Sequence, residues 1–466
     1  MKRVLLVGLF IFGLFLSQVV KAATFNVTNA TDFQTALTTA QSNGENDTIN
    51  LAAGTYSGAF IYNADTTGLG ETQSLTIIGT DGKDNTFITA TNDPQNPTGD
   101  ALTISGTTVS ISGITFSNND NGVLINDVAF GDPYGPLVVS VQNCEFQNNI
   151  DVGLSVEFSY EKSGDQIGSV SIASNVFDQN GADGPYYGSG VHIETDGSAS
   201  IPLDNITLTT NEFTGNQGSE YGSGLYIYLG TGVSLNNPLN LSANQFTDNT
   251  NQYIGAGLYF EIHSNNTTIS LTGNTFHHNI SDSYAGGAYI EMDGNNSTVT
   301  VGGDGVADKN VFTQNGDGDG NALYLYSSVS TNQFNVSYNI FGSTDASNGN
   351  GNTDNGKGTV YASILGNFTF TNNQILNNKA RRYAGLYLTI PGDSSNTSSV
   401  NISNNEFTGN QGFYTGGGLG LSLSCACTLN LNSNLISWSV SVLVCVSSQC
   451  NRFMGVFCVE VVVGYG

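Results

Sequence analysis

One phrase, Asn-x-Phe-x-x-Asn, returns along most of this chain. Complete copies begin at Asn175, Asn211, Asn244, Asn274, Asn310 and Asn405, and degenerate copies centre on Phe116, Phe146, Phe341, Ile375 and Ile436. The copies follow one another at a nearly regular spacing from Phe116 to Ile436, which is typical of a repeat protein. So short a unit cannot bury its own apolar face, and successive copies must therefore stack on one another.

Each copy follows a short segment in which apolar and polar residues alternate, such as Ile206-x-Leu208. A period of two is typical of a strand with one buried face. After the phrase, a variable polar loop leads to a Gly-led strand such as Gly255-Ala-Gly257-Leu-Tyr-Phe260. We therefore expect an all-β solenoid of parallel strands, with three short strands in each of about 11 to 13 rungs. We also expect the Asn at each bend to adopt the left-handed backbone region and to pass amide hydrogen bonds between rungs.

The two ends of the chain depart from the repeat. Residues 1–22 read as a secretory signal peptide, with a basic start and an apolar run from Val4 to Leu16. Residues 23–110 contain an amphipathic segment, Ala30 to Gln41, that predicts a helical cap over the first rungs. Residues 111–437 form the repetitive body. From residue 438 to 466 the pattern stops in mid-rung, which favours an aberrant or truncated tail over a membrane anchor.

Charge and cysteine usage exclude several classes of protein. The formal net charge of −27 becomes −30 without Lys2, Arg3 and Lys21, and such a surface repels nucleic acids and anionic lipids. All cysteines except Cys144 lie near the end of the chain, from Cys425 to Cys458. The body is therefore not a disulfide scaffold. The mature body also contains no predicted transmembrane span.

The predicted cap and the repeated rungs together resemble a known family of folds. The predicted helix, followed by Ile49-x-Leu51-x-x-Gly54-Thr-Tyr56 and then the Asn rungs, resembles the right-handed parallel β-helix of the pectin-lyase-like superfamily. The alternation of Phe-x-x-Asn with Gly286-Gly287-Ala288 is similar to the repeats of polymorphic outer-membrane adhesins. The resemblance covers about residues 23–437 and implies a right-handed coil. It implies no single function, because the superfamily includes lyases, hydrolases, esterases, tailspikes and adhesins.

Alignment of the Gly-led strands predicts two outward columns on one face. The first column contains His192, Tyr226, Tyr259, Tyr289, Tyr324, Tyr361 and Tyr387. The second contains Glu194, Tyr228, Glu261, Glu291 and Tyr326. A further set of loop tyrosines could wall a groove beside them: Tyr187, Tyr221, Tyr253, Tyr284, Tyr383 and Tyr414. Two interpretations stay open, namely a platform for a polysaccharide or cell-surface glycan and a self-stacking ladder that stabilises strand pairing.

Glu261 and Glu291 occupy adjacent rungs, so we expect their carboxylates to lie within about 5 to 6 Å of each other. That separation suits the acid and nucleophile of a retaining glycosidase, with Glu194 or His263 assisting. A calcium ion bridging the pair is another interpretation, as is a pair of solvated side chains. A pectate-type lyase would need a basic residue, but the only basic cluster, Lys379-Ala-Arg381-Arg382, lies far along the rod.

Two short motifs offer further chemistry. Asp317-Gly-Asp319-Gly could hold calcium, or it could be a plain acidic turn. Asn352-Thr353-Asp354 matches one catalytic motif of polygalacturonases, but the family's other motifs are missing, so chance is favoured.

The combined pattern predicts an exported protein, extracellular, at the cell surface or periplasmic, that binds glycans or mediates adhesion through the Tyr column. The alternative is a polysaccharide hydrolase or lyase, and a structural spacer is third.

Overall fold

The structure is a computed structural model. It describes residues 22–64, 74–90, 99–127, 137–159, 167–195, 201–218, 220–316, 318–351, 356–392, 397–415, 417–437, 443–446 and 461–462. The signal-peptide prediction, Asp317 and the Asn352–Asp354 tripeptide therefore fall outside the described residues, apart from Ala22.

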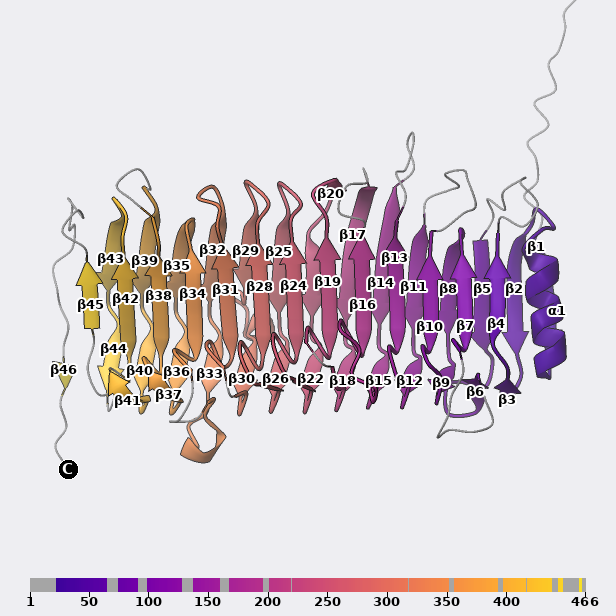
Figure 1. The fold of residues 1–466 in the computed structure, drawn as a ribbon, viewed down its shortest axis with the longest axis horizontal. Coiled ribbons are helices and arrows are strands. Elements are labelled where there is room, and N and C mark those ends of the chain that lie inside the picture. The colour runs from indigo at the N-terminus through magenta and orange to yellow at the C-terminus, as the bar shows by residue number, and fades with distance from the viewer. Residues whose placement is uncertain are drawn as a thin grey trace, which may run out of the picture.

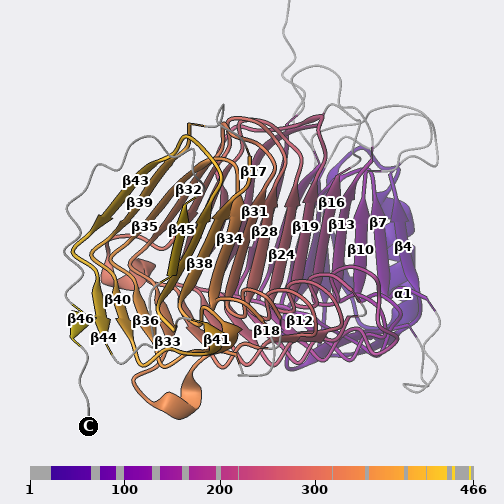
Figure 2. The same cartoon turned by 60° about the vertical axis from the view of Figure 1, so that its left-hand side comes forward.

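Three parallel sheets run the length of a rod (Figure 1). Sheet A runs from β1 (Ala22–Val27) to β43 (Thr428–Asn432), and its described strands number 15. Sheet B has 14 described strands and begins at β3 (Gly54–Ser57), whereas sheet C has 13 and begins at β4 (Phe60–Asn63). One strand of each sheet belongs to each rung, so the predicted parallel solenoid with three strands per rung is confirmed. Figure 2 shows the rungs obliquely, stacked side by side.

A helix covers the first end of the rod. Helix α1 (Ala30–Ala40) lies beyond the first strands in Figure 1, where the sequence predicts a cap. Its apolar face is buried, and the Phe33 ring lies 4.6 Å from that of Phe60 and 6.0 Å from that of Tyr56, measured between centroids. The Asn29 side chain accepts a hydrogen bond from the Asp32 amide at 3.0 Å and so caps the helix start.

Two ladders of buried asparagines follow the corners on either side of sheet B. One contains Asn175, Asn211, Asn244, Asn274, Asn310, Asn339, Asn373, Asn405 and Asn434, and the other contains Asn119, Asn149, Asn180, Asn216, Asn249, Asn279, Asn315, Asn350, Asn378 and Asn410. At Asn244, the Nδ2 group donates to Asn274 Oδ1 at 3.1 Å and to the Leu208 carbonyl at 2.9 Å. The predicted transfer of amide hydrogen bonds from rung to rung is confirmed.

The left-handed backbone lies one residue earlier than the sequence predicts. Thr210, Ala243 and Asp248 have φ angles of 54°, 56° and 57°, and each directly precedes a ladder asparagine. The prediction that the ladder asparagines themselves adopt this region is wrong. Because the preceding residue makes the bend, the asparagine side chain turns into the corner, where its amide reaches the next rung.

Between the two ladders, a column of phenylalanine rings fills the core. The stacked rings are those of Phe116, Phe146, Phe177, Phe213, Phe246, Phe276, Phe312 and Phe341, all buried. Neighbouring centroids are 4.6 to 5.2 Å apart, which is the distance set by strand spacing. The central residue of the repeated phrase is therefore the core residue of sheet B.

The tail is described only in part. Of residues 438–466, the structure describes β45 (Leu443–Val446) and β46 (Val461–Val462), which pair in parallel with the last rung. The interpretation of this segment as aberrant stays a prediction. Within the described residues, Cys425 and Cys427 form a disulfide, Cys144 is free and buried, and no helix is long and apolar enough to cross a membrane.

The ladder generates a stability prediction. Asn244→Ala would leave the Leu208 carbonyl and the Asn211 amide unpaired in the interior, because Asn211 N donates to Asn244 Oδ1 at 3.0 Å. We expect a loss of about 2 to 5 kcal/mol in the free energy of unfolding. Urea titration followed by circular dichroism measures it. Asn240→Ala, at a half-exposed position on β21 (Leu239–Ser242), the strand before this corner, should cost less than about 0.5 kcal/mol, and equal losses would contradict the ladder's role.

A candidate ligand-binding face on sheet C

The predicted Tyr column exists as a register of directly paired residues. Five neighbouring strands carry its first part, namely β16 (Val191–Thr195), β19 (Leu225–Leu229), β24 (Leu258–Ile262), β28 (Ala288–Met292) and β31 (Leu323–Ser327). On them, His192 pairs with Tyr226, and Tyr259, Tyr289 and Tyr324 follow in turn. Tyr361 and Tyr387 continue the column on the next two strands. These strands lie side by side in Figure 2.

The central rings of this column are covered. Tyr226 and Tyr259 are each 3% exposed, and Tyr289 and Tyr324 are each 7% exposed. A glycan platform, one of the two interpretations of the column, needs open rings, and these four rings are covered. Strand alternation determines that a side chain leaves the sheet on its outer side, but not whether another segment covers it. His192, Tyr361 and Tyr387 are less completely covered.

The covering layer is built from the loop tyrosines. Tyr187 stacks on Tyr226 with ring centroids 4.7 Å apart, and Tyr221 stacks on Tyr259 at 5.5 Å. Tyr284 meets Tyr324 edge-on at 5.6 Å. The sequence placed these loop residues beside the column as a wall, whereas the structure places them over it. The column and its cover form a second apolar cluster outside the solenoid core.

Two loop tyrosines beside the column are more exposed than any ring within it. Tyr253 is 44% exposed and Tyr186 is 48% exposed. Sequence reasoning missed Tyr186, although its place beside Tyr187 was a usable signal. Its ring contacts Tyr221 with centroids 5.3 Å apart, so the exposed rings rest on the buried ones.

The second predicted column is also in register. Glu194 pairs with Tyr228, which pairs with Glu261, and Glu291 and Tyr326 follow. These side chains remain accessible, since none of the five is fully buried. Glu157, which pairs with Glu194, extends the row by one rung and was missed because its strand lacks the paired glycines of the Gly-led phrase. This row is hereafter the acidic row: Glu157, Glu194, Tyr228, Glu261, Glu291 and Tyr326.

Buried hydroxyls orient the two central carboxylates. The Tyr226 hydroxyl donates to Glu261 Oε2 at 2.9 Å, and the Tyr259 hydroxyl donates to Glu291 Oε2 at 2.9 Å. Burial, with the nearby carboxylates, raises the pKa of both tyrosines, so both remain protonated donors. Each buried hydroxyl thus finds an acceptor one rung further along the rod, and each carboxylate is held by it.

A histidine joins the Glu pair on its outer side. His263 Nε2 lies 3.2 Å from Glu261 Oε1, and its Nδ1 lies 3.9 Å from Asp293 Oδ2. The three side chains are 26 to 28% exposed, so water or a ligand can reach them. The hydrogen bond to Glu261 is the main cause that raises the pKa of His263. The sequence suggested His263 as a helper, and the structure adds Asp293.

The two carboxyl groups have pKa values shifted in opposite directions. Burial alone would raise the pKa of Glu261, but hydrogen bonds from His263 and Tyr226 outweigh it and hold that pKa below its ordinary value. Burial raises the pKa of Glu291, and repulsion from Asp293 and Glu261 adds to it, while the Tyr259 hydrogen bond opposes it only in part. Glu261 therefore loses its proton at a lower pH than Glu291 does.

The remaining predicted site residues lie apart from this cluster. His192 Nε2 is 3.1 Å from Glu194 Oε2, two rungs before the Glu pair. Asp319 Oδ2 lies 3.3 Å from Lys357 Nζ, so this carboxylate is engaged in an ion pair, and Asp317 is outside the described residues. In the part of the chain that the structure describes, no group of three or more His, Cys, Asp or Glu side chains is arranged to hold a metal. Calcium binding stays a prediction.

Comparison with known proteins gives no assignment. No protein-family model, no curated protein and no solved structure matches the chain. The structure itself establishes the fold as a parallel β-solenoid with asparagine ladders.

The His263–Glu261 contact predicts a pH dependence of stability. A raised His263 pKa stabilises the fold fully below about pH 6.5, and this contribution is lost as pH rises through the raised value. The lowered pKa of Glu261 stabilises the fold above about pH 4.3, and this contribution is lost as pH falls through the lowered value. We expect the stability difference between the native chain and His263→Gln to shrink as pH rises above 6.5. Urea midpoints measured across this range test it. In a Glu261→Gln background the same substitution should show a weaker trend, because Asp293 and Glu291 still raise the pKa of His263, and an undiminished trend would contradict the pairing.

The burial of the Tyr column predicts that substitutions of Tyr259 and Tyr253, which are close in sequence, lower the free energy of unfolding by different amounts. Tyr259→Ala should lower the free energy of unfolding by about 3 to 5 kcal/mol, because it empties a buried ring site and removes the donor to Glu291. Tyr253→Ala removes an exposed ring and should cost less than about 1 kcal/mol. Thermal and urea unfolding of both variants provide the measurement. A stable Tyr259→Ala variant would mean that the column is a surface feature after all.

Proposed function

We propose that the protein is an exported surface or extracellular β-solenoid that binds glycan chains along the outer side of sheet C. One observation carries the proposal, namely the acidic row with His263 and Asp293, whose central carboxylates are held in fixed orientations by buried tyrosine hydroxyls. The buried Tyr column acts as the foundation of this surface. The resemblance to β-helix adhesins and polysaccharide-active proteins supports the same class of ligand.

The chemistry of the row suits a chain of hydroxyl groups. Carboxylates accept hydrogen bonds, the His263 ring donates or accepts, and the rings of Tyr228, Tyr253 and Tyr326 offer apolar faces to the C–H side of a sugar. The row also repeats with each rung, about 4.8 Å apart. A periodic, elongated surface matches a polymer better than a small compact ligand.

Charge selects among glycans. The chain carries a formal charge of −27, and the row itself is acidic. A polyanion such as a uronate polymer would be repelled from this face, whereas a neutral chain would not. We therefore infer that neutral polysaccharides are the preferred ligands of sheet C.

A second candidate function, glycoside hydrolysis, is favoured by the opposite pKa shifts of the Glu pair. Two carboxyl groups with separated pKa values are the arrangement that a retaining hydrolase uses. Glu291, which keeps its proton longer, would act as the acid, and the ionised Glu261 would act as the nucleophile. His263 would position Glu261 through the bond to Oε1.

Affinity electrophoresis of the full chain in gels of neutral polysaccharide tests the binding proposal. Tyr228→Ala combined with Tyr253→Ala should weaken retardation by about tenfold, because both rings lie on the accessible surface. Asn240→Ala on sheet A serves as the control and should be retarded like the native chain. Undiminished retardation of the double variant would refute binding at sheet C.

The hydrolase alternative has a separate readout. If the native chain releases reducing ends and Glu291→Gln does not, while the variant is still retarded in the gel, hydrolysis is assigned to the Glu pair. Release that continues in Glu291→Gln would remove this pair from consideration.

A further inference from the structure

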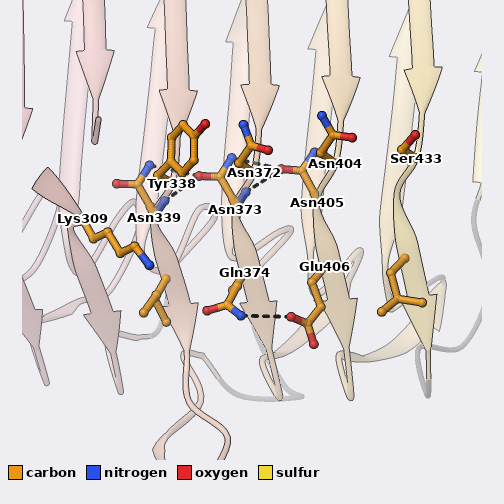
Figure 3. Close-up of a pocket in the computed structure, with 12 residues that line it drawn as sticks. Lys309, Tyr338, Asn339, Asn372, Asn373, Gln374, Asn404, Asn405, Glu406 and Ser433 are labelled. Atoms are coloured by element: carbon orange, nitrogen blue, oxygen red, sulfur yellow. Dashed lines mark hydrogen bonds between the residues drawn. The ribbon is translucent and has the colours of Figure 1, made fainter. Parts of the chain in front are cut away.

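A groove of about 440 Å³ lies at the corner of the rod where sheet A meets sheet B (Figure 3). On the sheet A side, its wall is a row of four corner residues: Tyr338, Asn372, Asn404 and Ser433. On the sheet B side, Ile340, Gln374, Glu406 and Leu435 form the opposite wall. The groove crosses four rungs and so runs along the rod axis, perpendicular to the strands.

The floor of the groove is rigid and chemically saturated. It consists of ladder asparagines, including Asn339, Asn373 and Asn405. Asn373 Nδ2 donates to Asn405 Oδ1 at 3.1 Å and to the Val336 carbonyl at 2.9 Å, and its backbone amide donates to Asn405 Oδ1 at 2.9 Å. These amides have no donor left for a ligand. Any recognition must come from the walls.

The walls carry polar groups that are not hydrogen-bonded to any other described side chain. Among the described residues, the Tyr338 hydroxyl, the Asn372 and Asn404 side-chain amides and the Lys309 ammonium make no hydrogen bond or ion pair. Figure 3 shows Tyr338, Asn372 and Asn404 projecting from one side of the groove and Lys309 reaching in from its end. Opposite them, Gln374 Nε2 donates to Glu406 Oε2 at 3.0 Å, which fixes both side chains.

This arrangement is confined to one part of the rod, although the corner position recurs in every rung. Before Tyr338 that position holds Asn143, then Ser174 and Thr210, whose hydroxyls lie 2.9 Å apart, and then Ala243, Gly273 and Lys309. Consecutive rungs with a large polar side chain at this corner begin only at Lys309 and continue through Tyr338, Asn372 and Asn404. Strand pairing does not require them, because the smaller residues serve the same bend elsewhere.

The balance of groups defines the ligand. One ring, two amides that both donate and accept, one ammonium and one carboxylate leave the groove without net charge, in a chain whose formal charge is −27. Amides and an aromatic face recognise hydroxyl groups and C–H faces, and the overall charge disfavours a polyanion. We propose that this groove is a second glycan-binding site, which takes a linear, neutral oligosaccharide lying along the rod axis. The site is built from other residues than the acidic row and does not rest on the function proposed for sheet C.

Calorimetric titration of the full chain with soluble cello-, xylo- and manno-oligosaccharides tests the proposal, with oligogalacturonate as the charged comparison. Tyr338→Asn removes the ring but keeps a residue that tolerates the left-handed backbone, and Asn372→Gly with Asn404→Gly removes the amides at positions where glycine is compatible. Each should weaken binding of a neutral oligosaccharide by about tenfold with an unchanged unfolding midpoint. Thr210→Gly, at the same corner position outside the groove, is the matched control and should bind like the native chain.

The outcomes separate this site from sheet C. Loss of binding in the groove variants, with binding preserved in Tyr228→Ala/Tyr253→Ala, supports the groove. Affinity that the groove variants leave unchanged, absence of binding by every neutral oligosaccharide, or tighter binding of oligogalacturonate would each overturn it. Loss of binding only in the sheet C variant would place the sugar on the acidic row and reject the groove.

Discussion

The buried amide of the repeated asparagine is the interaction on which the rest of the structure depends. Each such side chain donates to the asparagine of the next rung and to a main-chain carbonyl of the preceding one, so consecutive rungs are locked in one register. A slip of one residue would leave buried polar groups unpaired, which is costly in an apolar interior. The Phe stack between the ladders requires the same register. Every outward column on the rod is aligned because these inner residues are aligned.

This alignment turns a periodic sequence into a periodic surface. On sheet C it stacks carboxylates and rings that lie a whole repeat apart in the chain, and it brings the Tyr259 hydroxyl to the Glu291 carboxylate of the next rung. At the corner of sheets A and B it lines up Tyr338, Asn372 and Asn404 over a floor of saturated amides. The two candidate sites therefore share one scaffold but use different chemistry, one acidic and the other without net charge.

The opposite pKa shifts of Glu261 and Glu291 follow from their neighbours, since the residue type and strand position are the same. Glu261 receives hydrogen bonds from both Tyr226 and His263, whereas Glu291 receives one from Tyr259 and faces Asp293. Sequence reasoning could place the two residues on adjacent rungs and could estimate their spacing. It could not say which carboxyl group loses its proton first, because that depends on which side chains converge on each carboxyl group, including those from the loop after each strand.

The sequence by itself determined the parallel solenoid, its three strands per rung, its helical cap and the register of the outward columns. It could do so because hydrophobic period and the Asn-x-Phe-x-x-Asn phrase are local properties repeated many times. Only the tertiary structure decided what covers those columns. The loop tyrosines Tyr187, Tyr221 and Tyr284 fold over the column and bury Tyr226 and Tyr259, leaving Tyr253 and Tyr186 at the surface. Loop paths depend on packing between neighbouring rungs, which no alternation of residues along one strand encodes.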